Sequence, residues 1–200
     1  MDTKDLLLLA AKKVFAQKGF DGATIKDLAD EAGVNVSLVS YHFGGKEALY
    51  RACLESFGRS RLAATERVLK KPTSLEDFKT RLTLFCEEFF EAHLAEPETT
   101  SILHRECSME LPVAKDLFKE VFIPTFAKLI EFFESGKKQG YLNQLRDPFV
   151  SAGLFFGSLV HVIRTDALQR EYFGKSLSDA KYRGQIIDIA INTFLYGSTK

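Results

Sequence analysis

Residues 24–46 read TIKDLADEAGVNVSLVSYHFGGK, and this stretch predicts two short helices joined by a tight turn. Thr24 is a candidate N-cap for the first helix, with Asp27 three residues later, so polar and negative groups meet the exposed amides of the first turn. Apolar residues then recur at helical spacing until Gly33, which tolerates the left-handed backbone that ends many helices. Asn35 is a second N-cap candidate and opens the second helix. The stretch therefore matches the helix-turn-helix pattern.

The second helix, predicted over residues 36–43, is the element that enters the DNA major groove in this pattern, while flanking groups contact phosphates. No Lys, Arg, Asn or Gln stands at residues 36–40, so readout rests on serine hydroxyls, thymine methyl groups and DNA shape. We therefore expect modest affinity per half-site and dependence on a dimer. The alternative for Tyr41 and His42 is that they only cover the core of the domain. The base-edge candidates are Val36, Ser37, Leu38 and Ser40, the phosphate candidates are Thr24, Lys26, Tyr41, His42 and Lys46, and Asn35 completes the predicted DNA-binding set.

The order and spacing of these residues resemble the DNA-binding domain of TetR-type (TetR/AcrR) transcriptional regulators, over roughly residues 6–55. The resemblance implies an N-terminal three-helix domain, a helical second domain that binds a small effector, and a phosphate role for the matching Thr, Tyr, His and Lys positions. Many members carry Tyr where this chain has Ser40, and the chain resembles a subgroup whose recognition helix ends in Tyr-His-Phe. Base preference therefore stays open. The resemblance is carried by GVNVSLVSYHFGGKEAL and, upstream, by Ala10, Ala11, Phe15, Lys18-Gly19-Phe20, Thr24, Leu28-Ala29 and Ala32-Gly33-Val34.

The composition fits an ordinary soluble protein, with 200 residues, 46% hydrophobic content and zero net charge. Zero net charge does not by itself argue for nucleic acid. No apolar run approaches the roughly 18–20 residues of a membrane span, and the start of the chain lacks the pattern of a signal peptide. Three widely spaced cysteines argue against a disulfide framework and for a reducing compartment. We expect a cytoplasmic protein without membrane contact.

The rest of the chain predicts further helices and no strand of useful length, so the fold class is all-α with about nine helices. Pro124 removes a backbone hydrogen bond inside a long predicted helix, and we expect a kink there. We assign residues 1–47 to a helix-turn-helix domain and residues 48–200 to a domain for effector binding and dimerisation. Besides the helix-turn-helix, helices are predicted over about residues 3–18, 46–70, 74–95, 98–109, 113–139 and 147–173, and from residue 178 to near Gly197, with a break at Pro112.

Phenylalanines at helical spacing in the second domain are candidates for the wall of an apolar pocket, which the resemblance associates with an apolar or amphipathic effector. For any single ring the alternative is ordinary core packing. Polar groups that orient a ligand are also expected, and Arg105 and Glu106 are candidates beside the histidines. The candidate pocket residues are Phe85, Phe89, His93, His104, Phe118, Phe122, Phe126 and Phe155.

Two other groupings in the second domain have competing explanations. Cys86 and His93 share a helix face, as do His104 and Cys107, so a metal site is conceivable, but the spacing matches no zinc pattern and we expect neither metal nor cofactor. Small and apolar residues on the last two predicted helices suit a two-fold dimer interface, and the alternative is burial within one chain. The candidate interface residues are Gly153, Leu154, Gly157, Ile187, Ile191 and Phe194.

Taken together, the sequence predicts a homodimeric, ligand-responsive transcriptional regulator, most often a repressor in proteins of this resemblance, that binds a palindromic operator in duplex DNA. No nucleophile motif, zinc-protease motif, phosphate-binding glycine loop or dinucleotide fingerprint is present, so we expect no enzyme. Two alternatives remain at this point. One is a helical adaptor protein that has lost DNA binding, and the other is a helical enzyme that uses His93 or His104 as a base.

Overall fold

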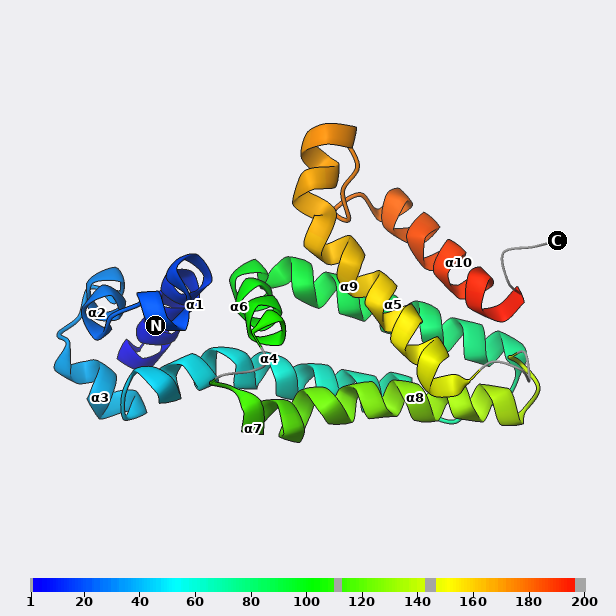
Figure 1. The fold of residues 1–200 in the computed structure, drawn as a ribbon, viewed down its shortest axis with the longest axis horizontal. Coiled ribbons are helices and arrows are strands. Elements are labelled where there is room, and N and C mark those ends of the chain that lie inside the picture. Colours follow the sequence, from blue (N-terminus) through cyan, green and yellow to red (C-terminus); the bar gives the residue numbers. More distant parts are fainter. Residues whose placement is uncertain (1, 110–112, 143–146, 197–200) are drawn as a thin grey trace. The chain divides into compact units, whose positions relative to one another are not determined.

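The computed structural model describes residues 2–109, 113–142 and 147–196. Within these ranges the chain is all-α and contains no strand, which confirms the predicted fold class (Figure 1). Since α7, η1 and α8 follow one another without a break, the described residues form nine helices. The predicted break at Pro112 and the predicted end near Gly197 lie outside the described residues. The elements are α1 (Thr3–Gly22), α2 (Ile25–Ala32), α3 (Ser37–Phe43), α4 (Lys46–Val68), α5 (Leu75–Ala95), α6 (Pro97–Ser108), α7 (Lys115–Leu117), the π-helical turn η1 (Phe118–Phe122), α8 (Ile123–Lys138), α9 (Pro148–Phe173) and α10 (Ala180–Tyr196).

The chain divides into two compact units, each built from two separate segments. The N-terminal unit comprises residues 1–60 and 96–123, and the C-terminal unit comprises residues 61–95 and 124–200. The unit that holds the helix-turn-helix therefore extends past residue 47 into α4 and also contains α6, α7 and η1. The functional boundary at residue 47 stays a prediction.

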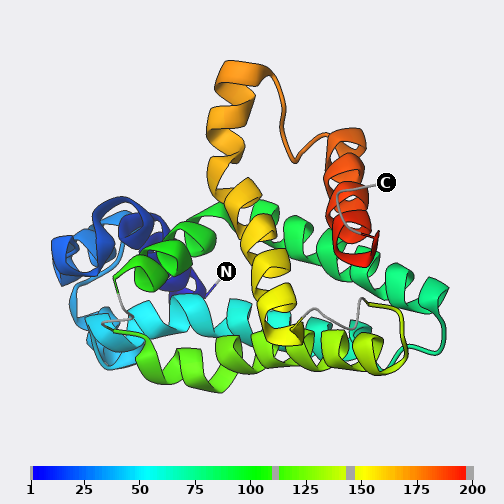
Figure 2. The ribbon, with the colours of Figure 1, turned by 45° about the vertical axis from the view of Figure 1, so that its right-hand side comes forward.

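The N-terminal unit is built around one apolar face of α1, on which Leu7, Ala11 and Phe15 are fully buried. The Phe15 ring meets the Tyr50 ring of α4 edge-on, with 4.8 Å between ring centroids. At Gly19 the backbone takes φ 73°, so the helical path breaks where the sequence predicts that the first helix ends. The figures show α6, drawn in green, beside α1, and the two helices are in contact (Figure 2).

The C-terminal unit has a core dominated by phenylalanine. Phe78 stacks on Phe132 with 4.6 Å between centroids, and Phe155 packs on Phe133 and Phe194 with 5.5 Å to each. Gly136 lies so close to this core that a Cβ built on it would be 2.5 Å from the Phe78 ring. Core packing therefore accounts for much of the periodic phenylalanine in the sequence.

The hydrogen-bonding pattern of the helical run changes just before Pro124. The turn η1 is π-helical, and the amide of Ile123 donates to the carbonyl of Phe118, five residues earlier. A proline provides no amide for the usual bond and crowds the preceding turn, so a wider turn just before it is a known accommodation. The structure shows a π-helical turn directly ahead of the proline, and the predicted kink itself stays a prediction.

Candidate nucleic-acid interface

The first helix of the helix-turn-helix, α2, begins with a complete capping box. The Thr24 hydroxyl accepts from the Asp27 amide at 3.0 Å, and the Asp27 carboxylate accepts from the Thr24 amide at 2.9 Å. Lys18 donates to the same carboxylate at 2.8 Å. The Lys18 hydrogen bond and the bonds from Thr24 hold the pKa of Asp27 well below its usual range. The predicted N-cap is confirmed, and it fixes the position at which α2 starts.

The turn between α2 and α3 is held by the two residues that the sequence singles out. Gly33 adopts φ 66° and its amide donates to Asp30, while the next amide, of Val34, donates to the carbonyl of Ala29 at 3.0 Å. This arrangement is the common glycine ending of a helix. The Asn35 side chain then accepts from the Ser37 amide, the first of α3, at 2.9 Å. Helix α3 begins one residue later than predicted, so Val36 and not Asn35 is the residue directly before it.

The recognition helix α3 presents one face to its own unit and the opposite face to solvent. Val39 is fully buried and anchors the helix, whereas Val36 is 45% exposed and Tyr41 is 80% exposed. Ser37 and Ser40 are also exposed. Tyr41 therefore does not cover the core, which removes that alternative for its ring. The exposed residues are those expected at base edges and phosphates.

Lys46, predicted to contact phosphate, already has internal partners. Its ammonium group donates to the carbonyls of Phe20 at 2.9 Å and Ala23 at 3.0 Å, and it lies 4.2 Å from the centroid of the Phe20 ring. An ammonium group has three donors, so two are used in closing the end of α1. The phosphate role of Lys46 stays a prediction, and its structural role is added by the geometry.

Few positively charged side chains lie near α3 in the sequence. Residues 1–60 contain eight Lys and Arg against eight Asp and Glu, and no Lys or Arg stands between Lys26 and Lys46. The predicted phosphate contacts therefore involve hydroxyl, imidazole and amide groups as well as the few cations. Such an interface predicts few released counterions and a shallow dependence of DNA affinity on salt.

Fold and helix-turn-helix together define the class: an all-α protein that carries a DNA-binding domain at its N-terminus and a helical second part. Residues 7–53 match the family model described as "Bacterial regulatory proteins, tetR family". Residues 7–53 are therefore similar to the DNA-binding domain of TetR-family regulators, and the chain is a DNA-binding transcriptional regulator. The match spans the helix-turn-helix and the start of α4, and it supports regulation rather than an adaptor that has lost DNA binding. The Tyr-His-Phe subgroup stays a prediction.

Named relatives agree with this assignment. The chain is 28% identical over 149 residues to "Probable HTH-type transcriptional regulator YttP" of Bacillus subtilis (strain 168), covering 71% of this chain and 69% of the relative. It is 32% identical over 104 residues to "HTH-type transcriptional repressor NicS" of Pseudomonas putida, covering 52% of this chain and 48% of the relative. The solved structure of the transcriptional regulator FadR from Bacillus subtilis in complex with stearoyl-CoA has a TM-score of 0.75 at 14% identity, covering 98% of this chain and 99% of that one. This structural likeness shows the fold alone.

The residues predicted to line an effector pocket divide between the two units. In the C-terminal unit, ring contacts connect Phe85 to Phe89 (6.0 Å between centroids), Phe89 to Phe156 (5.3 Å) and Phe156 to Phe126 (5.6 Å). Phe155 lies instead in the packed core described above. The members of the C-terminal unit are Phe85, Phe89, His93, Phe126 and Phe155, and those of the N-terminal unit are His104, Phe118 and Phe122.

His93 places a polar group inside this aromatic series. Its side chain is 5% exposed, its ring lies 4.1 Å from the Phe89 ring, and its Nδ1 lies 2.6 Å from the Phe89 carbonyl oxygen. A carbonyl oxygen only accepts hydrogen bonds, so Nδ1 carries the proton in this contact. The ligand role of these residues stays a prediction.

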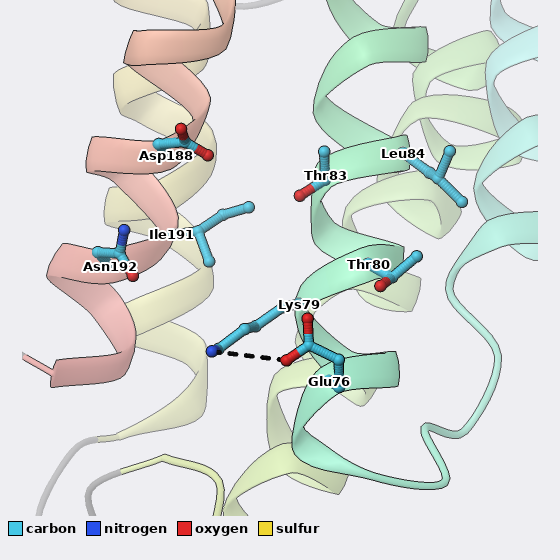
Figure 3. Close-up of a pocket in the computed structure, with 8 residues that line it drawn as sticks. All are labelled: Glu76, Lys79, Thr80, Thr83, Leu84, Asp188, Ile191 and Asn192. Atoms are coloured by element: carbon cyan, nitrogen blue, oxygen red, sulfur yellow. Dashed lines mark ion pairs between the residues drawn. The ribbon is translucent and has the colours of Figure 1, made fainter.

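A separate hollow of about 310 Å³ lies between α5 and α10, and six of its eight lining residues are polar or charged (Figure 3). Lys79 pairs with Glu76 at 3.8 Å on α5, and a hydrogen bond with Tyr196 raises the pKa of Lys79. None of the predicted effector residues lines this hollow. Its lining comprises Glu76, Lys79, Thr80, Thr83, Leu84, Asp188, Ile191 and Asn192.

The six predicted interface residues differ in exposure. Leu154 is 64% exposed, Gly157 is exposed and Gly153 is half-buried, all on α9. On α10, Ile187 and Ile191 are 1% and 4% exposed, and Phe194 packs on neighbouring rings, so these three side chains are used within the C-terminal unit. The other exposed apolar side chains of the two helices are Phe149, Val150, Leu168, Tyr172, Phe173, Ile189 and Tyr196.

Helix α9 qualifies one expectation from the sequence. Among the described residues it is the one helix long and apolar enough to cross a membrane by length and composition, although no single uninterrupted apolar run reaches that length. Only 22% of its most apolar window is buried within the chain. Length and composition alone are weak evidence for a membrane span. The exposed apolar face of α9 is typical of a surface that packs against another molecule.

The cysteines and histidines that the sequence singles out divide between the two units. Cys86 and His93 belong to the C-terminal unit, and His104 and Cys107 belong to the N-terminal unit. Within the described ranges, no cluster of three or more His, Cys, Asp or Glu is arranged to hold a metal ion. Burial raises the pKa of the Cys53 thiol to about 12 and also raises that of Cys86.

Arg105 and Glu106, expected to orient a ligand, have partners inside the N-terminal unit instead. The guanidinium group of Arg105 donates to the carbonyls of Phe15 at 2.8 Å and Ala16 at 3.0 Å. The Glu106 carboxylate, 2% exposed, accepts from the Tyr50 hydroxyl at 2.7 Å. Burial, and then the bond to Glu106, raises the pKa of Tyr50, so its hydroxyl stays a donor. Glu106 lies one turn after the buried Ile102, and that spacing is the signal for a buried carboxylate that the sequence analysis missed.

Proposed function

We propose that this regulator binds a palindromic operator as a homodimer, represses transcription there, and releases the DNA when a small effector binds its C-terminal unit. The observation that carries the proposal is the geometry of α3, which is anchored by buried Val39 and exposes Val36 and Tyr41 on its outer face. A helix held in this way can enter the major groove without losing its packing. The name of the NicS relative, a transcriptional repressor, supports the sign of regulation.

The division of labour within the interface follows from side-chain chemistry. Val36, Ser37, Leu38 and Ser40 meet base edges, where hydroxyls and apolar groups discriminate less strongly than Arg or Asn would. Thr24, Lys26, Asn35, Tyr41, His42 and Lys46 contact or orient phosphates. Each half-site is therefore weak, and operator binding needs both halves of a dimer.

A second copy of the chain is the proposed cover for the exposed apolar face of α9. Leu154 is 64% exposed, and a Cβ built on Gly157 meets nothing within 4 Å, so another helix can approach closely at this point. A two-fold contact buries the same face on both copies and places two recognition helices on one DNA site. Sedimentation at micromolar concentration measures this directly, and a monomer under those conditions contradicts the proposal.

The proposed effector is an apolar or amphipathic small molecule that binds among the aromatic series around Phe89 and His93. The FadR structure, whose title records stearoyl-CoA, supports this class of ligand for the fold. The effector acts by binding better to a conformation whose recognition helices do not fit both half-sites, so the population shifts away from DNA. We propose that the chain acts by binding alone, without catalysis, in the cytoplasm. Linkage requires effector and operator to weaken each other by the same factor.

The test of DNA binding begins with selection of bound duplexes from random DNA, followed by fluorescence anisotropy on the selected sequence. We expect a palindrome whose half-sites lie about one helical turn apart. The titration should give a stoichiometry of one dimer per palindrome. Matched duplexes with one half-site scrambled serve as the control. Absence of binding to any duplex at low ionic strength, without effector, contradicts the proposed function.

A further inference from the structure

Helix α6 lies outside the predicted DNA-binding domain, yet two of its adjacent residues hold the helices on either side of the helix-turn-helix. Arg105 reaches the last regular turn of α1, and Glu106 reaches Tyr50 near the start of α4. Both contacts lie within the N-terminal unit. The recognition helix is carried between α1 and α4, so its position depends on how these two helices are fixed.

Arg105 supplies hydrogen-bond donors to carbonyl groups of α1 near the point where its helical path breaks. The α1 path breaks at Gly19, and Arg105 supplies two charged donors to the carbonyls of Phe15 and Ala16 just before that break. A cation at this end also suits the negative end of the helix dipole. The fit is close, because a Cβ built on Gly19 would lie 3.0 Å from the Arg105 guanidinium.

The Glu106 contact ties α4 to the chain that follows α6. One carboxylate oxygen accepts from the Tyr50 hydroxyl, and the other accepts from the Ala114 amide at 3.1 Å. The Tyr50 ring in turn packs on the Phe15 ring of α1 and on the Phe20 ring, 5.1 Å between centroids for the latter. A buried carboxylate costs free energy unless it is hydrogen-bonded, so these bonds fix its place.

We propose that Arg105 and Glu106 are positioning residues for DNA binding, which clamp α1 and α4 onto α6 and thereby set where α3 stands. The proposal rests on the proposed function, because it assigns these residues a part in operator recognition. Neither residue touches DNA. Loosening either contact leaves a folded protein whose recognition helix is less well placed, so specific binding suffers more than non-specific binding.

The first measurement is hydrogen exchange on the free, full-length protein. Arg105→Met keeps an apolar stem and removes the donors, and Arg59→Met is the matched control, an exposed arginine of the same unit paired with Glu55. We expect amides in the last turn of α1 and the first turns of α4 to exchange about tenfold faster in Arg105→Met, the effect of about 1.4 kcal/mol. Amides of α10 should not change, and neither should any amide in Arg59→Met. Unchanged exchange in α1 overturns the proposal.

The second measurement compares the selected operator with a scrambled duplex, at a temperature where circular dichroism shows every variant fully folded. For Arg105→Met we expect about a tenfold loss in operator affinity, the same about 1.4 kcal/mol, with scrambled-duplex affinity within about twofold. Arg105→Lys should regain part of the loss. Glu106→Leu should show the same pattern as Arg105→Met, because it keeps an apolar side chain of similar size and removes both acceptor oxygens. Equal loss on both duplexes, or no loss on either, overturns the positioning role.

The two failures can be told apart. If the wild-type protein binds no duplex, the proposed function fails and the positioning role in DNA binding fails with it, whatever the exchange result. If the wild-type protein binds its operator while Arg105→Met binds equally well, only the positioning role is wrong.

Discussion

Tyr41→Phe is the sharpest test of the DNA interface, because it removes one hydroxyl from a side chain that is 80% exposed. A hydrogen bond to a charged group contributes about 1.5 kcal/mol at the lower end of its range, which suits an exposed phosphate contact. A dimer loses this bond at both half-sites, about 3 kcal/mol in all, so operator affinity should fall by about a hundredfold. The free energy of unfolding should change by less than about 0.5 kcal/mol, because the exposed hydroxyl supports no packing.

The assay is fluorescence anisotropy on the selected operator at several salt concentrations, with urea unfolding in parallel. The tyrosine hydroxyl is neutral, so the slope of log affinity against log salt should stay the same in Tyr41→Phe. In Lys26→Met the slope should become shallower by about two, one phosphate at each half-site. Tyr172→Phe on α9 is the matched control, and sedimentation confirms that each variant keeps its oligomeric state. Wild-type affinity in Tyr41→Phe, with stability unchanged, refutes the assignment of Tyr41 to phosphate.

Further predictions concern stability and reactivity. Gly136→Ala should destabilise the C-terminal unit by about 1–3 kcal/mol through overpacking. Gly184→Ala, with nothing within 4 Å of its Cβ, should instead stabilise α10 by about 0.5–1 kcal/mol. Urea unfolding measures both, and a change of the same sign in the two free energies of unfolding would contradict the packing described here. The lowered pKa of Asp27 means that its stabilisation is present above the unfolded-state pKa of about 4 and is lost as pH falls below it; Asp27→Asn should remove that part of the acid dependence, measured by unfolding between pH 5 and about 2. At pH 8, exposed Cys107 should react with a thiol reagent well before Cys53, whose pKa is about 12; equal rates in mass spectrometry would contradict the burial.

The helix-turn-helix could be predicted from the sequence because its signals are local. The N-cap at Thr24, the glycine ending at Gly33 and the side-chain bond of Asn35 each act within four residues of their own position. Such contacts do not depend on the rest of the fold. Val39 alone of its helix is buried, while Ser37, Ser40 and Tyr41 on the other sides of the helix are exposed, as the predicted set of DNA-facing residues requires.

The roles that the sequence could not assign depend on contacts far apart in the chain. Lys46 reads as a phosphate contact, yet Phe20 and Ala23, more than twenty residues earlier, occupy two of its donors. Arg105 bonds a carbonyl 90 residues away, which no spacing rule indicates. Ile187 has the apolar spacing of an interface residue and is buried within its own unit. An apolar stripe identifies a buried face and does not say which surface buries it.

The two-segment construction of the N-terminal unit has a consequence for protein engineering. A chimaera that joins residues 1–47 to a foreign sensor would carry Gly19 without the arginine that closes its helix, and would lack Tyr50 as well. A graft that keeps residues 1–60 together with 96–123 retains both. Exchange of DNA specificity in this chain therefore calls for a two-piece transplant, with junctions at three places in the recipient sequence.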